Sequence, residues 1–261
     1  MGSDEPAGRT LEAVEKAFDV VETLWEMEGA GVTAVAEALD LPKSTVHAHL
    51  RTLESNGYVV NDGGEYRLGL RFLTFGEFVR RAEPLFHAAR QPIDDLAERT
   101  GERALCMTEQ NGLGMVLYVG TGTRSLTGDV TVGTSVYHHC SAGGKAMMAH
   151  YPRERVDAIV DRWGLPAFTD ETITDRETLL DELATVREEG IAFNREEYLR
   201  GVLAVGVPIF DATESVCGAV TLAGPVRRLY SEREPEALHD ALLATANTIE
   251  VNLVVADGRS T

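Results

Sequence analysis

The chain has 261 residues, which is long for one ordinary domain and suits two. Its hydrophobic content of 44% is ample for packed cores, and its longest apolar run, residues 201–210, is far short of the roughly 20 residues that cross a bilayer. The formal net charge of -18, from 24 Lys+Arg and 42 Asp+Glu, is the opposite of the basic balance expected of a DNA-binding protein.

Apolar spacing predicts the first two helices. In residues 9–29, apolar side chains three and four positions apart mark one face of a helix that ends at Gly29. Residues 33–41 predict a second, short helix, followed by a turn and by Pro42, which suits the first turn of a third helix. The apolar face of the first helix consists of Leu11, Val14, Phe18, Val21 and Trp25.

A hairpin is predicted after the third helix, which should end near Asn56-Gly57. Two strand-like pieces, residues 58–60 and 66–68, flank the segment 61-NDGGE-65, and Asp-Gly-Gly between short strands is a strong hairpin signal. Three helices followed by a hairpin predict a winged helix-turn-helix domain over residues 1–69.

Residues 70–83 predict a linker helix, and the pattern beyond them changes to mixed helices and strands. One helix is expected to start at a Thr174–Glu177 capping box and to run to Gly190. Residues 84–261 are therefore expected to form an α+β unit, a twisted sheet with helices. Its other helices are expected near 84–100, 152–163 and 234–254, and its strands near 103–110, 114–121, 202–210 and 216–223.

The third helix is the candidate DNA-binding element. Its inward side is expected to hold Val46, His49, Leu50 and Leu53, and residues 41–53 contain Lys43 and Arg51 but no carboxylate. The first helix, in contrast, is rich in acidic side chains, so the acid lies away from the face that would meet a phosphate backbone. Because a recognition helix enters the major groove, its outward side chains are the expected DNA contacts: Lys43, Ser44, Thr45, His47, Ala48 and Arg51. An amphipathic helix with an ordinary polar face is the alternative.

Five segments resemble the IclR family of transcriptional regulators. The segments 37-EALDLPKSTVHAHLRTLESNGYVV-60 and 66-YRLGLRFLTFG-76 resemble the DNA-binding domain of that family. The segments 137-YHHCSAGGKAMMAHYP-152, 189-EGIAFNREEYLRGVLAVGVPIFD-211 and 219-AVTLAGP-225 resemble its effector-binding domain. The resemblance covers about residues 9–255, in matching order.

The resemblance implies a winged helix, a linker helix and a GAF-like effector-binding domain. It also implies homodimers, or dimers of dimers, that bind double-stranded operator DNA, and small organic acids, aromatic acids or sugar-derived metabolites as effectors. By position, the residues that line the implied effector site are Leu126, Val136, Ala142, Gly143, Asn194, Ala204, Thr221 and Ala223.

The implied effector site has a chemical basis but departs from the family. A glycine-rich turn leading into a helix presents backbone N–H groups to a carboxylate, and Thr221 can add a hydroxyl opposite. Asn194 stands where some members have an acidic residue, Ala204 where Cys occurs and Ala223 where Ser is frequent. On the recognition helix, Ala48 replaces a common Arg, and its methyl can pack against thymine.

Enzyme hypotheses find little support in the sequence. His138, His139 and Cys140 suggest a Cys/His nucleophile, but sequence neighbours on an extended segment point to opposite faces. The segment around Gly143 lacks the glycine and the Ser/Thr of a P-loop, and the adjacent Glu196-Glu197 is interpreted as a solvated turn. We expect no catalytic residue, no cofactor and no metal. The three cysteines are too far apart for a disulfide framework.

Two function classes remain. The favoured one is a transcriptional regulator whose dimer presents two winged helices to a pseudo-palindrome and whose DNA affinity changes when a metabolite binds. The alternative is a small-molecule binding module, or a degenerate enzyme, whose winged helix mediates protein contacts. The N-terminal residues lack the pattern of a signal peptide, so a cytoplasmic protein is expected. Acidic excess with only three lysines favours a salt-accumulating halophile over an ordinary acidic protein.

Overall fold

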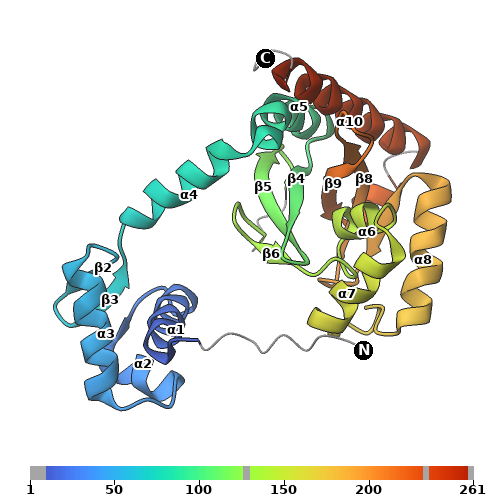
Figure 1. Cartoon of the computed structure of the whole chain (residues 1–261). Helices are drawn as coiled ribbons and strands as arrows, with labels where there is room; N and C mark the ends of the chain where they lie inside the picture. Colours follow the sequence, from blue (N-terminus) through green and yellow to red (C-terminus); the bar gives the residue numbers. More distant parts are fainter. Residues whose placement is uncertain (1–9, 126–129, 232–234, 258–261) are drawn as a thin grey trace. The chain divides into compact units, whose positions relative to one another are not determined.

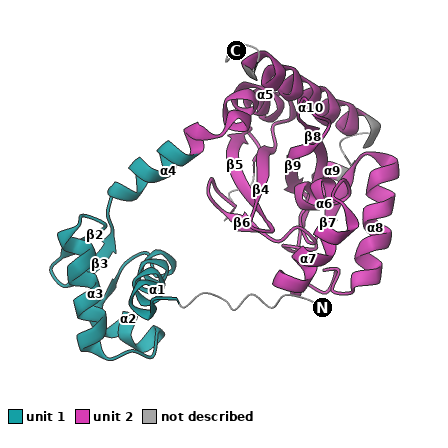
Figure 2. Ribbon diagram, viewed as in Figure 1, with its two compact units in different colours: residues 1–79 teal, residues 80–261 magenta. Residues whose placement is uncertain are grey.

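The computed structural model describes residues 10–125, 130–231 and 235–257. The chain divides into two units, residues 1–79 and 80–261, drawn in separate colours in Figure 2. Within these described residues, no helix combines the length and apolar character that a membrane crossing requires.

The first unit is the predicted winged helix-turn-helix. Its three strands form an antiparallel sheet in the order β1-β3-β2, and Val59 pairs with Leu68 and Asp62 with Glu65. At the tip of this hairpin, Asn61 Oδ1 accepts a hydrogen bond from Gly64 N at 2.9 Å, and Gly63 and Gly64 both have positive φ. The elements are α1 (Glu12–Glu26), β1 (Ala30–Gly31), α2 (Val32–Ala38), α3 (Lys43–Ser55), β2 (Val59–Asp62) and β3 (Glu65–Leu68).

The core of the first unit uses another face of α1 than the expected one. Val20 and Leu24 of α1 pack with Val35 of α2 and with Val46 and Leu50 of α3. The apolar spacing predicted the helix correctly. Most of the side chains with that spacing are nevertheless exposed to solvent in this chain: Leu11 is 69%, Phe18 62% and Trp25 67% exposed.

Helix α4 (Arg71–Ala82) contains no buried residue. Its large apolar side chains Leu73, Phe78 and Val79 are exposed, as is Leu70 just before it. Its first turn is held to the winged helix, because Arg71 Nη1 donates to Asn56 O at 2.6 Å and the guanidinium lies 4.9 Å from the centre of the Tyr58 ring.

The second unit is built on a six-stranded antiparallel sheet in the order β6-β5-β4-β9-β8-β7. Its sheet and helices confirm the expected α+β class (Figure 1). The strands are β4 (Arg103–Gln110), β5 (Leu113–Thr121), β6 (Ser135–Val136), β7 (Ala192–Arg195), β8 (Val202–Phe210) and β9 (Val216–Pro225). The helices are α5 (Pro84–Thr100), α6 (Ala142–Met148), α7 (Arg153–Trp163), α8 (Arg176–Glu189), α9 (Val226–Ser231) and α10 (Pro235–Asp257).

Helices cover both faces of this sheet. Helices α5 and α10 pack on one face around Ile93, Val205 and Leu242. Helices α6, α7 and α8 lie on the other face, where Met107, Met147 and other side chains form a second cluster. Close contact on the first face requires glycine at position 120, since a Cβ there would lie 2.8 Å from Ile93 O.

The N-cap of α8 differs by one residue from the expected one. Asp175 caps the helix, and its Oδ2 accepts from Thr178 N at 2.9 Å, whereas Thr174 was expected to cap it with Glu177. A carboxylate at this position accepts a charge-assisted hydrogen bond and faces the positive end of the helix, so it is the stronger cap.

Candidate DNA-binding helix and effector site

Helix α3 presents most of the expected DNA contacts to solvent. Lys43, Ser44, His47, Ala48 and Arg51 are exposed, while Thr45 is only half-exposed. Val46 and Leu50 are fully buried and hold the opposite face of α3 in the core of the first unit. The outward surface of α3 is therefore basic and small, with no carboxylate between positions 41 and 53.

The wing, which is the β2–β3 hairpin, carries acidic side chains at its tip, in contrast to the basic surface of α3. Asp62 and Glu65 face each other across the hairpin, and both are exposed. Arg67 Nη2 lies 3.8 Å from Asp62 Oδ2, a distance typical of a weak surface pair. Any binding of a phosphate backbone by the first unit therefore depends on α3 more than on the wing.

The expected effector residues come together where α6 begins against β8 and β9. A Cβ added to Gly206 of β8 would lie 2.8 Å from the carbonyl carbon of Ala142, and one added to Gly143 would lie 2.6 Å from Thr221 Oγ1. The same Cβ at Gly143 would collide with Met107 Sδ. The glycines thus allow α6 to approach the sheet directly.

Strand register aligns three more of the expected residues. Asn194 pairs with Ala204, and Ala204 pairs with Ala223, so these side chains form one row across β7, β8 and β9. Thr221 lies in the next row, paired with Gly206. Thr221 Oγ1 is buried, and no residue that the structure describes offers it a hydrogen bond. A buried hydroxyl in that state is a favourable partner for a polar ligand atom.

The other two expected residues lie apart from this row or cannot be placed. Val136 of β6 is buried in the cluster beneath α6 and packs close to Gly114, so it serves as core. Leu126 lies outside the described residues.

The turn after β7 is not the solvated turn expected from Glu196-Glu197. Glu197 is only 5% exposed, and its Oε1 lies 2.8 Å from Nζ of the fully buried Lys145 of α6. Glu182 of α8 lies 2.8 Å from the same Nζ. Burial raises the pKa of Glu197 although Lys145 favours its charged form. This ion-pair cluster was not predicted from the sequence, in which a lysine inside an apolar helix is its one signal.

Asn194 is fixed by the same turn. Its Oδ1 accepts a hydrogen bond from Glu197 N at 2.8 Å. Because a backbone N–H can only donate, the oxygen of this amide must face Glu197 and the NH2 group must point elsewhere. Asn194 therefore presents donors to any molecule that meets its other side.

The His138-His139-Cys140 segment is buried, and burial disfavours the charged forms of its side chains. Burial lowers the pKa of His138 to about 4 and raises the pKa of the Cys140 thiol to about 12. His139 Nε2 lies 3.1 Å from Pro166 O. A nucleophilic cysteine needs a lowered pKa and an adjacent base, so this segment lacks the properties of a Cys/His catalytic pair.

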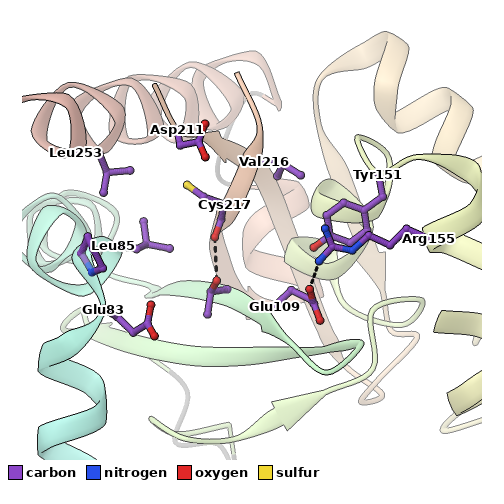
Figure 3. Close-up of a pocket in the computed structure, with 11 residues that line it drawn as sticks. Glu83, Leu85, Glu109, Tyr151, Arg155, Asp211, Val216, Cys217 and Leu253 are labelled. Atoms are coloured by element: carbon purple, nitrogen blue, oxygen red, sulfur yellow. Dashed lines mark hydrogen bonds and ion pairs between the residues drawn. The ribbon is translucent and has the colours of Figure 1, made fainter. Parts of the chain in front are cut away.

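A cavity of about 380 Å³ lies at the other end of β4 and β9 (Figure 3). Arg155 pairs with Glu109 there and lies 4.1 Å from the centre of the Tyr151 ring, and Thr108 Oγ1 donates to Cys217 O. None of the expected effector residues that the structure describes borders this cavity. The residues labelled in Figure 3 are Glu83, Leu85, Glu109, Tyr151, Arg155, Asp211, Val216, Cys217 and Leu253.

The first unit is a winged helix with no carboxylate over residues 41–53, and the second unit is a sheet domain with a buried polar site. Together they define a ligand-responsive DNA-binding regulator. The IclR helix-turn-helix family model matches residues 13–63, and the bacterial transcriptional regulator IclR C-terminal model matches residues 78–251. The chain therefore belongs to the IclR family of transcriptional regulators, with a DNA-binding and an effector-binding domain.

Similar proteins agree with this assignment over nearly the whole chain. The probable HTH-type transcriptional regulator ArcR of Halobacterium salinarum is 32% identical over 252 residues, which are 95% of this chain and 96% of ArcR. The crystal structure of the Thermotoga maritima IclR has a TM-score of 0.76 at 26% identity and covers 94% of this chain and 99% of its own. An IclR homologue from Microbacterium hydrocarbonoxydans, complexed with 4-hydroxybenzoate, has a TM-score of 0.78 at 20% identity, with 94% and 100% coverage.

Proposed function

We propose that α3 binds in the major groove of an operator. The observation that carries this proposal is the basic outer face that α3 presents over residues 43–51, where no carboxylate occurs, in a chain of net charge -18. Arg51 is long enough to reach a phosphate or a guanine, and Lys43 and Ser44 lie at the end of the helix that enters the groove first. Thr45, His47 and Ala48 complete the contact surface.

The DNA-binding form is a homodimer, or a dimer of dimers, on a pseudo-palindromic site. The exposed apolar side chains of α4, and those of the unpacked stripe of α1, support this, since such side chains rarely remain in water. The domains are residues 1–69, the linker helix 70–83 and the effector-binding domain 84–261.

The effector is a small metabolite bound where α6 meets β8 and β9. The proposed lining consists of Ala142, Gly143, Asn194, Ala204, Thr221 and Ala223. Binding changes the geometry of the dimer and hence its DNA affinity, and DNA changes effector affinity by the same factor. The 4-hydroxybenzoate in the Microbacterium hydrocarbonoxydans homologue makes aromatic acids a suitable first panel.

The protein acts in the cytoplasm by binding and not by catalysis. The protonated, buried Cys140 and the neutral His138 support this, because neither has the ionisation that a nucleophile or its base requires. The acidic composition suits a cytoplasm of high salt, and a similar protein comes from Halobacterium salinarum. At about 1 M salt the Debye length is only about 3 Å, so acid elsewhere in the chain scarcely repels DNA.

A footprinting experiment with the DNA upstream of the chain's own gene tests this function. Protection of two half-sites, released or strengthened by an organic acid, is expected in molar KCl. Binding of a metabolite without binding of any duplex, at any salt concentration, would leave the alternative: a binding module whose winged helix contacts protein.

A further inference from the structure

Arg103 lies in the same row of the sheet as the expected effector residues. It pairs with Ala223, which pairs with Ala204, which pairs with Asn194. Residues paired directly across antiparallel strands point to the same face. The neighbouring Glu102 is on the opposite face, where Arg228 binds it, so Arg103 points to the face that α6 partly covers.

This row forms a short floor with a polar group at each end. Arg103 and Asn194 are three strand spacings apart, roughly 14 Å between their backbones, and the methyl groups of Ala204 and Ala223 lie between them. Because paired residues point to one face, both side chains stand on the side of the sheet that α6 partly covers. A separation of this size suits a benzene ring or a chain of a few carbons with a polar group at each end.

The floor is separate from the two hydrophobic cores. Ala204 and Leu105 are each 6% exposed, and Leu105 pairs with Thr221 in the adjoining row. Neither Ala204 nor Leu105 belongs to the cluster under α5 and α10 or to the one under α6, α7 and α8. The row therefore lies outside both clusters, on the face of the sheet that α6 partly covers.

Three described side chains beside this row, those of Arg103, Asn194 and Thr221, can donate hydrogen bonds. Arg103 carries only N–H groups, and its Nη2 donates to the carbonyl of Val130. The oxygen of Asn194 is taken by Glu197 N, so its NH2 group is what a bound molecule meets. Thr221 adds a buried hydroxyl that can donate. Burial lowers the pKa of Arg103, yet a guanidinium remains charged well above neutral pH.

We propose that Arg103 is the specificity-determining residue of the effector site, and that the effector is an organic acid with a second oxygen function at its far end. Its carboxylate binds Arg103, its apolar body lies on Ala204 and Ala223, and its distal oxygen accepts from Asn194. This inference rests on the proposed function in taking this face as the effector site.

The donors of Arg103 and Asn194 favour a carboxylate over a sugar hydroxyl at this position. Every hydroxyl of a buried sugar brings a proton that needs an acceptor, and burying it without one costs free energy. A carboxylate brings acceptors only, so it matches Arg103, and its charge-assisted bonds are the stronger kind.

Calorimetric titration of the full chain with four probes tests the proposal without any mutation. The acids are 4-hydroxybenzoate and adipate, and the neutral partners are 4-hydroxybenzamide and adipamide. At least one acid is expected to bind roughly ten- to hundredfold more tightly than its amide, because an amide cannot form the ion pair. Equal affinity within both pairs, or binding by neither acid, overturns the proposal.

Substitution of Arg103 then tests whether this residue causes the preference for acid over amide. Arg103→Gln is expected to remove most of the preference of the wild type for acid over amide, and Arg103→Lys to keep part of it. The matched control is Arg195→Gln, since Arg195 lies on β7 beside Asn194, on the opposite face and exposed. Thermal unfolding of each variant shows whether it is folded. An acid preference that survives in a folded Arg103→Gln protein refutes the assignment.

The two proposals fail in different ways. If the chain binds and releases operator DNA in response to a neutral metabolite, with Arg103→Gln responding as the wild type does, only the Arg103 proposal is lost. If the acids bind through Arg103 but no duplex is ever bound, the regulator proposal is lost while the Arg103 assignment stands.

Discussion

Lys145 Nζ lies 2.8 Å and 3.0 Å from the two carboxylate oxygens of Glu197, and the side chains are 0% and 6% exposed. This ion pair joins α6 to the turn that holds Asn194. Glu182 of α8 is a second partner of the same Nζ. The beginning of α6 and the turn that fixes Asn194 are thus held in place by one buried cation.

Removal of that cation should be costly. Lys145→Met leaves Glu197 buried without its partner, and we expect the free energy of unfolding to fall by about 3–5 kcal/mol. Adding Glu197→Leu should recover part of this loss, because no uncompensated charge then remains. Urea unfolding of the full chain measures both.

The control for this experiment breaks an exposed ion pair. Arg200 and Asp170 are 71% and 86% exposed, so Arg200→Met should change the free energy of unfolding by no more than about 1 kcal/mol. If Lys145→Met costs no more than Arg200→Met, the buried pair does not hold α6 in place.

His138 should make the second unit sensitive to mild acid. Its pKa is lowered by burial from 6.5 to about 4, so between these values the unfolded chain binds more protons than the folded one. The stability that His138 contributes is therefore present above pH 6.5 and is lost as the pH falls towards 4. Between pH 7.5 and 5.5 we expect a loss of about 1 kcal/mol from this group.

His138→Leu removes this titration. Urea midpoints at pH 7.5 and 5.5 should therefore differ less for the variant than for the wild type, whatever the variant's stability at pH 7.5. An unchanged difference would mean that His138 is already protonated in the folded protein or gains a partner there.

Much of the fold was predictable because it depends on local signals. The spacing of Val46, Leu50 and Leu53 identified α3 and its outer face, and the 61-NDGGE-65 segment identified the hairpin. The predicted buried face of α1 was wrong for a physical reason. Leu11, Phe18 and Trp25 have the period of a helix, but the period alone does not say which apolar face is buried.

The buried polar residues of the second unit could not be predicted from local sequence signals. Glu197 looked like a surface carboxylate because its partner Lys145 lies 52 positions away in the sequence and meets it only after folding. Arg103 belongs to the candidate site only through strand register, which sets four strands side by side in an order that no local pattern encodes. Pairing between residues this far apart in the chain cannot be inferred from a single sequence.

Arg51 should dominate binding by α3, because Ala48 leaves little basic surface beside it. We expect Arg51→Ala to weaken operator binding roughly ten- to hundredfold, the range for loss of a hydrogen bond from a charged group. Fluorescence anisotropy with a labelled operator measures it. Arg200→Ala removes the same charge from an exposed position of the second unit and should leave affinity within about twofold. Equal effects would show that only net charge matters.

The acidic wing should oppose DNA binding. Replacing Asp62 by Asn and Glu65 by Gln removes two exposed carboxylates from the hairpin tip. If the wing lies near phosphates, affinity should rise several-fold at low salt, with the gain shrinking as salt screens it. The same titration by anisotropy, from low to molar KCl, measures this, and a gain that is independent of salt would point to a change in fold and not in charge.

The apolar side chains of α4 should hold the dimer together. Phe78 is 75% and Leu73 67% exposed in the single chain, an unfavourable state for large apolar groups in water. Phe78→Asp is expected to shift the protein towards monomers in analytical ultracentrifugation. Because two winged helices then no longer act together, operator binding should weaken as well. Thr33→Asp introduces the same charge at a polar, exposed position of α2 and should leave the dimer intact. A monomeric wild type at micromolar concentration, or a Phe78→Asp dimer as stable as the Thr33→Asp one, would show that α4 does not form the interface.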